Sequence, residues 1–430
     1  MSRMLNKPGA ERVYLGMNAA FSLFSATIFV TYTVYFVNRV HLDPLQLVLV
    51  GTTLEATALV FEVPTGLVAD LYGRRLSVIL GMLLVGAAFA WIGLAPSFAV
   101  VLIGQVISGI GYTFLSGATD AWLADEAGED QIARIYLRSG QINRAMGLLG
   151  TGLSVALASQ ALNLPYLCGG LGFLVLALFL VWAMEERHFT RPAAGQRQLV
   201  WTTVRQTLGQ SALAIRRSPV LRMLTLVSLV GGAASEGFDR LHDAHLLQNF
   251  TFPALGALQP VVWFGILSAC GGVFSMLVVA LLQKRAARAS QNATTTARFL
   301  FVLNGLSIAA VIVFALTGSF LLAAAALFVK AAADALSTPL YTTWLVQNIQ
   351  PQVRATVLSM SAQANAIGQV TFGPGIGAVG RGVSLRAALV LAGALLAPVS
   401  LLYGRSLRAG ESRAAGESPV VEPLNPQSPG

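Results

Sequence analysis

The sequence has few charged residues: Asp, Glu, Lys and Arg make up 11% of its 430 residues, against roughly a quarter in a typical soluble domain. Hydrophobic residues make up 55%. This composition excludes an ordinary soluble fold, so lipid must surround most of the chain. Because lipid offers the backbone no hydrogen-bond partners, runs of about 20 apolar residues must cross it as helices.

The chain also lacks residues on which several other functions depend. Its two cysteines, Cys168 and Cys270, both fall in apolar runs, so they predict neither a disulfide nor a metal site. No Gly-x-x-x-x-Gly-Lys-Ser/Thr loop occurs, which disfavours ATP-driven pumping. With four histidines and no Gly-x-Ser-x-Gly motif, a membrane-embedded enzyme is disfavoured too. We therefore expect no enzyme and no cofactor.

Apolar runs long enough to cross a bilayer recur along nearly the whole chain. The first is too long for a signal-peptide core and no small-residue cleavage pattern follows it, so we expect it to remain as a helix. The runs predict twelve spans, near 15–37, 46–70, 75–94, 99–123, 139–161, 164–184, 220–245, 258–282, 298–317, 320–345, 356–378 and 384–403.

The net charge of +9 is unevenly distributed over these spans. If the N-terminus is cytoplasmic, only Arg39, Arg381 and Arg386 fall in the outer segments, and most other Lys and Arg residues fall in the inner ones. That asymmetry follows the positive-inside rule and argues against a nucleic-acid partner. It predicts a multi-pass protein of the plasma (inner) membrane with both termini in the cytoplasm.

A polar interval at 185–219 separates six spans from six and predicts a cytoplasmic linker. Four polar or aromatic residues recur with a shift of 222 positions; chance is the alternative explanation. An even number of spans between copies gives both halves the same orientation, and a cavity forms between such halves. The recurring residues are Trp122, Ser139, Gln141 and Asn143, repeated as Trp344, Ser361, Gln363 and Asn365.

These features predict an all-α membrane protein with twelve transmembrane helices in two parallel six-helix repeats. A cytoplasmic N-terminus (1–14) precedes the first bundle (15–184), and the second bundle (220–403) follows the linker. The tail at 404–430 is rich in Gly, Ser, Glu and Pro, which predicts disorder.

Between the second and third spans runs Gly66-Leu-Val-Ala-Asp70-Leu-Tyr-Gly73-Arg74-Arg75, after Glu62-Val-Pro64-Thr65. It resembles the signature loop of the major facilitator superfamily, Gly-x-x-x-Asp-x-x-Gly-Arg-Arg/Lys. The resemblance covers nearly the whole chain, because the twelve spans and the repeat also fit that family. It implies a transporter fold in which spans one, four, seven and ten line a central cavity.

The resemblance also implies a latch that holds the two halves together on the cytoplasmic side when the protein faces outward. Gly66 would permit close helix contact, Gly73 a sharp turn, and Asp70 would face a helix N-terminus. Arg74, next to Arg75, would pair with an acid of the fourth span, and two candidates fit. These are Asp120 and Asp125.

Three family patterns are missing or displaced. The second-half counterpart of the loop, Gln283-Lys-Arg-Ala-Ala-Arg288, lacks the Gly and Asp positions, so the latch is expected to be one-sided. The fourth span reads Gln105-Val-Ile-Ser108-Gly109-Ile-Gly111, without the Arg that the family links to proton coupling. Gly-Pro falls in the eleventh span, as Gly373-Pro374, and not in the fifth, where drug antiporters carry it.

Ionisable residues inside spans are costly and are therefore candidates for substrate contact or ion coupling. Lys330 lies deep in the tenth span with Asp334 one turn away, and an internal structural pair is the alternative. For Glu55 in the second span, coupling and structural hydrogen bonding are equally open, and for Arg144 a structural pair with Asp120 or Asp125 is favoured.

The seventh span carries a cluster of ionisable residues near its outer end. Glu236 and Arg240 are one turn apart, and Asp239 shares a face with His242 and His245. Gating, proton transfer and metal binding are all open for the cluster. A solvated helix end is favoured over metal binding, because no cysteine or further histidine lies nearby, so we expect no metal.

The leading hypothesis is a secondary transporter that exports small, amphipathic molecules in exchange for protons by alternating access. The alternatives are a proton-coupled uptake symporter for a nutrient or siderophore-like compound, and a transport-inactive receptor or scaffold. The expected partners are a small-molecule substrate, protons and the lipid bilayer, and the expected oligomeric state is a monomer.

Overall fold

The computed structural model describes residues 9–189, 219–254, 260–347 and 354–404, which are helical almost throughout and contain no strand. The N-terminal half is built from eight helical segments. They are α1 (Ala10–Phe29), α2 (Tyr32–Asn38), α3 (Pro44–Tyr72), α4 (Arg74–Leu94), α5 (Phe98–Leu115), α6 (Ala118–Ala127), α7 (Glu129–Ala158) and α8 (Leu164–Ala183).

The C-terminal half has six described helices. They are α10 (Pro219–Asn249), α11 (Val262–Ala289), α12 (Ala293–Leu316), α13 (Phe320–Gln347), α14 (Arg354–Gly382) and α15 (Leu385–Leu395). After a turn at Leu396, helix resumes to Gly404, so the last span runs from Leu385 to Gly404. Each half therefore crosses six times, and the predicted twelve-span fold is confirmed.

Two spans of the first half consist of two helices each. Helices α1 and α2 meet at Thr31, whose φ of −117° and ψ of 11° depart from helical values. The Thr31 hydroxyl lies 3.0 Å from that of Ser154 in α7, which satisfies a buried polar group at the break. Helices α5 and α6 meet at Gly117, whose φ of 70° favours glycine.

Nine of the described spans have the length and apolar composition of a membrane crossing. Helices α7, α10 and α14 are long enough but more polar, with 30, 31 and 29 residues. Helix α7 begins at Glu129, ten residues before the predicted span, because its first turns are polar and escape a search for apolar runs.

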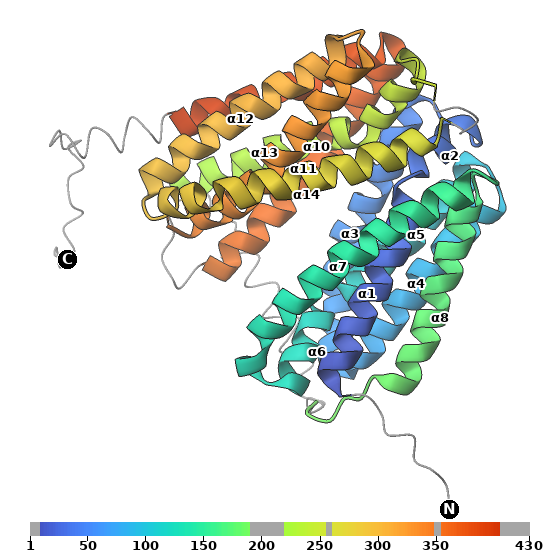
Figure 1. The fold of residues 1–430 in the computed structure, drawn as a ribbon. Helices are drawn as coiled ribbons and strands as arrows, with labels where there is room; N and C mark the ends of the chain where they lie inside the picture. The colour runs from blue at the N-terminus through green and yellow to red at the C-terminus, as the bar shows by residue number, and fades with distance from the viewer. Residues whose placement is uncertain (1–8, 190–218, 255–259, 348–353, 405–430) are drawn as a thin grey trace, which may run out of the picture.

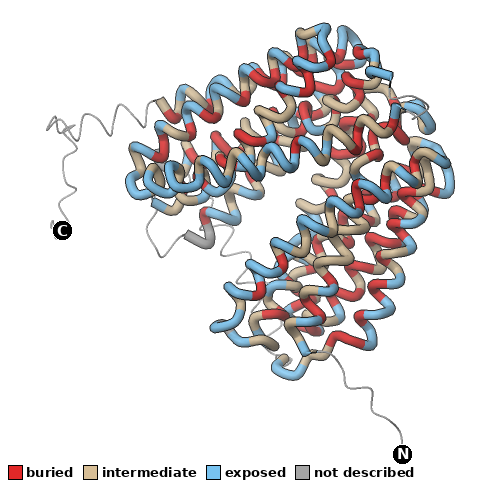
Figure 2. Tube along the Cα trace, viewed as in Figure 1, coloured by how far each residue is buried: buried red, intermediate tan, exposed pale blue. Residues whose placement is uncertain are grey.

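Figure 1 shows the helices gathered in two bundles that meet at one end and diverge toward the end that carries the N-terminus. Figure 2 shows buried residues inside each bundle and exposed ones on its outer surface. Much of that outer surface is apolar: on α8, Leu171, Val175 and Leu178 are 57%, 65% and 66% exposed. A lipid-facing helix surface has this character.

The bundles touch where α3 of the first half packs along α14 of the second. A Cβ atom built at Gly377 would lie 3.0 Å from the Cβ of Val48, so the absence of a side chain lets the backbones approach. At the outer edge of this contact, Arg381 pairs with Asp43 at 3.5 Å. These contacts close one end of the molecule.

The internal repeat is visible in matching contacts of the two halves. Trp122 and Trp344 are 1% and 0% exposed. Asn365 in α14 donates to the backbone carbonyl of Ser228 in α10 at 3.3 Å. With its amide oriented to satisfy the surrounding carbonyls, Asn143 in α7 donates to the carbonyl of Asn18 in α1 at 3.2 Å. In each half, an asparagine of the fifth span thus binds the first.

Candidate functional site

The Gly66–Arg75 loop forms the corner between α3 and α4, at the end where the halves diverge. Gly73 ends α3 and precedes α4 with φ 118° and ψ 145°, a backbone conformation that side chains disfavour. The sharp turn predicted at Gly73 is therefore present. The corner places Arg74 and Arg75 in the first turn of α4.

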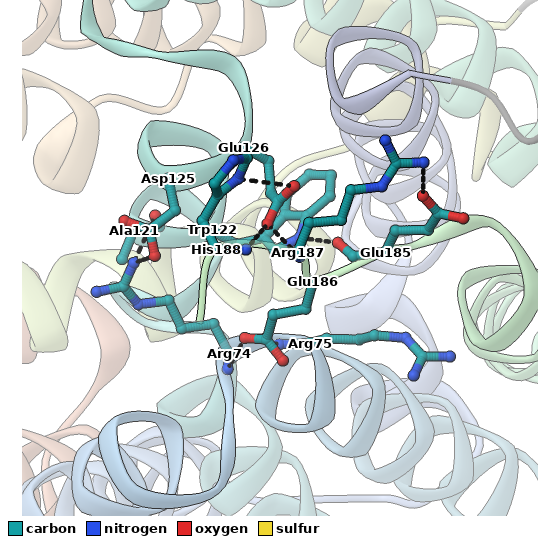
Figure 3. Close-up of polar contacts among 10 residues, drawn as sticks. All are labelled: Arg74, Arg75, Ala121, Trp122, Asp125, Glu126, Glu185, Glu186, Arg187 and His188. Atoms are coloured by element: carbon teal, nitrogen blue, oxygen red, sulfur yellow. Dashed lines mark hydrogen bonds and ion pairs between the residues drawn. The ribbon is translucent and has the colours of Figure 1, made fainter. Parts of the chain in front are cut away.

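Arg74 reaches α6, where its guanidinium pairs with Asp125 and donates to the carbonyl of Ala121 at 2.9 Å (Figure 3). Of the two acids predicted as partners, the structure therefore selects Asp125. Asp120 instead accepts a hydrogen bond from the hydroxyl of Tyr14 in α1 at 3.1 Å. Among the described residues Arg144 pairs with neither acid, so that expected structural pair is not formed.

Residues just after α8, in the predicted linker, belong to the same network. The Glu186 carboxylate accepts from the backbone N–H groups of Arg74 and Arg75 at 2.6 and 3.3 Å, which caps α4 at its N-terminus (Figure 3). The indole of Trp122 donates to the carbonyl of Glu185 at 2.7 Å. Sequence reasoning missed Glu186; its only signal was two acids after an apolar run.

A further acid of α6 holds the same segment. Glu126 accepts from the backbone N–H groups of Arg187 and His188 at 2.6 and 3.0 Å. The His188 ring lies 3.4 Å from its other oxygen. Residues 185–188 are thus fixed to the first bundle, and residues 190–218 of the predicted linker lie outside the described residues.

The remaining latch residues make no contact with the second half in this structure. A Cβ atom at Gly66 would meet nothing within 4 Å, so the predicted close helix contact is not formed. Asp70 is exposed and binds no described residue. All contacts of the Arg74 network lie within the first half, so the latch does not join the bundles in this conformation.

In α13, Lys330 and Asp334 form the predicted pair, with 2.5 Å between Nζ and Oδ2. The ammonium also lies 4.4 Å from the centre of the Phe238 ring, a cation–π contact with α10. Asp334 accepts a second hydrogen bond, from Ser307 of α12 at 3.2 Å. The Lys330 side chain is 13% exposed and that of Asp334 47%, so the pair reaches an open space.

Two cavities meet at this pair. The first, about 480 Å³, lies between α1 and α2 of the first half and α10, α11 and α13 of the second. The second, about 660 Å³, lies inside the C-terminal half and is more polar, with Ser228, Tyr341 and Ser361 joined by hydrogen bonds of 2.6 to 3.4 Å. Both are lined by Phe238, Asp239, Lys330 and Asp334.

Glu236 and Arg240 form the other predicted pair, at 3.2 Å, and they lie between the halves. The Glu236 side chain is 2% exposed. A Cβ atom at Gly51 of α3 would overlap both side chains, which shows that the pair packs directly on the first half. Glu55, one turn further along α3, has no described hydrogen-bond partner and is partly exposed.

The geometry does not bring the histidines of α10 together with Asp239 as metal ligands. His242 stacks on Phe238 with 5.1 Å between ring centres, and its Nε2 lies 3.2 Å from Asp243. His245 is fully buried against Phe250 and Phe314. In the described part of the chain, no three His, Cys, Asp or Glu residues are grouped to hold a metal ion.

The loop, the paired halves and the central cavity agree with the comparison to known families. Residues 15–373 match the sequence profile of the Major Facilitator Superfamily. The chain belongs to this superfamily. A relative from Bacillus subtilis (strain 168), the uncharacterized MFS-type transporter YxaM, is 22% identical over 364 residues, which cover 83% of this chain and 86% of the relative.

Solved structures with the same fold align with nearly the whole of this chain. The nucleoside transporter NupG has a TM-score of 0.73 at 14% identity and covers 93% of this chain and 99% of its own. A bacterial homolog of the human lysosomal transporter Spinster, in an inward-facing and occupied conformation, gives 0.70 at 16%, covering 93% and 96%. By its family match and its relative, this superfamily member is a multi-pass membrane transporter.

Proposed function

We propose that the protein exports small amphipathic molecules across the plasma membrane in exchange for protons, by alternating access. The observation that supports this proposal best is the 480 Å³ cavity, which has walls from both halves. Its volume falls within the roughly 300–1,000 Å³ that hold drug-sized ligands. Its walls combine aromatic rings with ionisable groups, as an amphipathic ligand requires.

The proposed orientation places the N-terminus, the Gly66–Arg75 loop and residues 185–188 in the cytoplasm. It rests on the excess of Lys and Arg in the inner segments. In that orientation the joined end at Val48 and Gly377 faces outward, and the diverging ends of the two bundles face the cytoplasm. Substrate enters from the cytoplasm. The diverged ends then close, so that Arg74 and Asp70 meet the second half, and the joined end opens to release the substrate outside.

Three sets of ionisable groups lie where protonation can be coupled to this movement. Lys330 and Asp334 face both cavities, so a bound proton or substrate competes for the same charges. Glu236 and Arg240 lie in the contact between halves, and Glu55 lies close enough to interact electrostatically with both. Protonation of Asp334 or Glu236 would neutralise the carboxylate and leave the charge of Lys330 or Arg240 unpaired. An unpaired buried charge is unfavourable, so protonation favours rearrangement of the contact.

Proton-coupled uptake is the second candidate. Two structural neighbours suggest nucleosides and peptides as substrates to test for it: NupG is a nucleoside transporter, and POT is a peptide transporter with a TM-score of 0.69 at 13% identity that covers 93% of this chain and 94% of its own. The shared fold alone does not identify the substrate of this protein. The direction of flux under a defined proton gradient separates the two candidates.

The test is dye exclusion by pump-deficient bacteria that express the wild type, Lys330→Ala or Lys284→Ala. Lys284 is the matched control, because it is exposed at the end of α11 and lines neither cavity. We expect the wild type and Lys284→Ala to exclude a fluorescent amphiphile, and Lys330→Ala or a protonophore to abolish exclusion. Dye accumulation faster than in empty-vector cells contradicts export and supports uptake.

A further inference from the structure

Asp239 of α10 carries the one carboxylate shared by both cavities that no described residue neutralises. Its side chain is exposed, while its backbone carbonyl accepts a hydrogen bond from Tyr32 of α2 at 3.2 Å. That bond fixes the residue at the boundary between the halves. Asp334, the other shared acid, is already paired with Lys330.

The cations near Asp239 are each bound to another acid. The Lys330 ammonium is held by Asp334 at 2.5 Å, and the Arg240 guanidinium by Glu236 at 3.2 Å. His242 faces Asp243 at 3.2 Å. Counting the ionisable residues that line the 480 Å³ cavity, three acids face one lysine and one histidine. The cavity therefore has an excess of negative charge even with the imidazole protonated.

The rest of the cavity wall is suited to an apolar, aromatic body. Its aromatic residues come from both halves and from three helices of the second half. A cation is attracted both by an unpaired carboxylate and by the faces of such rings. An anion would meet Asp239 unscreened. The rings are those of Phe29, Tyr32, Phe238, Phe264 and Phe328.

We propose that Asp239 binds the positively charged group of a cationic amphiphile, whose apolar body packs against the aromatic residues of the 480 Å³ cavity. The proposal rests on the proposed function in treating this cavity as the substrate site. Because Phe29 and Tyr32 belong to the first half and Asp239 to the second, a ligand bound there contacts both halves. The charge of the bound ligand therefore acts on both halves, which move relative to each other during transport.

Binding is measured on the purified full chain in lipid nanodiscs, with empty nanodiscs subtracted, so that no transport is needed. The probes are tetraphenylphosphonium, a lipophilic cation, and triphenylphosphine oxide, a neutral molecule with three of the same rings. The variants are Asp239→Asn, Asp239→Glu and Asp130→Asn. Asp130 is the matched control, since it is exposed on α7 and lines neither cavity.

We expect the wild type, Asp239→Glu and Asp130→Asn to bind the cation, and Asp239→Asn to bind it about tenfold more weakly, as loss of one nearby charge in a partly solvated site implies. Binding of the neutral probe should not change with any variant. The proposal is overturned if the wild type binds the cation no better than the neutral probe, or if Asp239→Asn keeps full affinity.

These results are independent of the flux assay. Charge-dependent binding through Asp239 without any flux would contradict the exporter and leave the cation site standing. Flux of a neutral or anionic compound, with no preference for the cation, would leave the transporter standing and overturn the cation site.

Discussion

The Lys330 ammonium is stabilised by two kinds of group, the Asp334 carboxylate and the face of the Phe238 ring. An ammonium at membrane depth without such partners is costly. The Lys330–Asp334 pair also lines both cavities. The contacts that lower the free-energy cost of burying the ammonium therefore also place it beside any molecule bound there. A structural role and a transport role of this pair predict different changes in stability and flux when one charge is removed and when both are.

A double-mutant cycle separates the two roles. Lys330→Ala or Asp334→Ala alone should lower the stability of the purified protein by about 1.5–3 kcal/mol, since each leaves a charge-assisted hydrogen bond unmade. The double variant should recover part of that loss, because neither charge remains unpaired. Thermal unfolding gives the stability, and flux in proteoliposomes gives the function. We expect the double variant to stay inactive; recovered flux would make the pair purely structural.

The sequence predicted the Lys330–Asp334 and Glu236–Arg240 pairs because both partners lie one turn apart on a single helix. It left Arg74 with two candidate acids, because the choice depends on which other helix reaches each one. Tyr14 of α1 binds Asp120 and leaves Asp125 to Arg74, a tertiary contact that no local pattern encodes. Glu186 was missed for the same reason.

The corner between α3 and α4 contains two glycines with different surroundings. A Cβ atom at Gly73 would lie 2.6 Å from an oxygen of Glu186, and its φ of 118° disfavours any side chain. A Cβ atom at Gly66 would lie in open space within a regular helix. Alanine at the two positions therefore tests the turn and the latch separately.

Gly73→Ala should destabilise the protein by about 1–3 kcal/mol, the usual cost of a strained backbone conformation. It should also displace Glu186 from the N-terminus of α4. Gly66→Ala should leave stability unchanged or raise it by up to about 1 kcal/mol, as alanine does in a helix. Thermal unfolding of both variants measures this difference. Equal destabilisation by the two substitutions would contradict the assigned environments.

Gly66→Ala also has a functional outcome. If Gly66 meets the second half only when the diverged ends close, the variant should keep its stability in this conformation and lose flux.

At the level of elements, the helices were predictable from apolar runs, whereas the break at Thr31 was not. It contains neither Gly nor Pro, and it is satisfied by Ser154 from α7, 123 residues away.

Over the whole molecule, the conformation depends on how tightly the joined end packs. One hydrophobic core extends from the first bundle through this contact into the second, and includes Val48, Leu241 and Ile376. A separate core around Trp344 lies within the second half alone. Parting of the bundles at the joined end would therefore divide the first core, whereas the second core would stay intact.

Gly51 of α3 lies at the centre of that contact, because Glu236 and Arg240 occupy the space where its side chain would be. Gly51→Val should force the pair aside and shift the population toward molecules that are open at this end. Gly152→Val in α7 is the control, since a Cβ atom there would meet nothing within 4 Å.

The shift is measured with a reporter cysteine in place of Val48, which is 0% exposed in this structure. Cys168 and Cys270 are first replaced by serine, because both are exposed and would react as well. A membrane-impermeant maleimide added outside intact cells should label the reporter faster in Gly51→Val than in Gly152→Val or in the reporter background alone. Equal rates would mean that the contact does not set the conformation. Faster labelling only from the cytoplasmic side, in inverted vesicles, would reverse the proposed orientation, because the same joined end would then face inward.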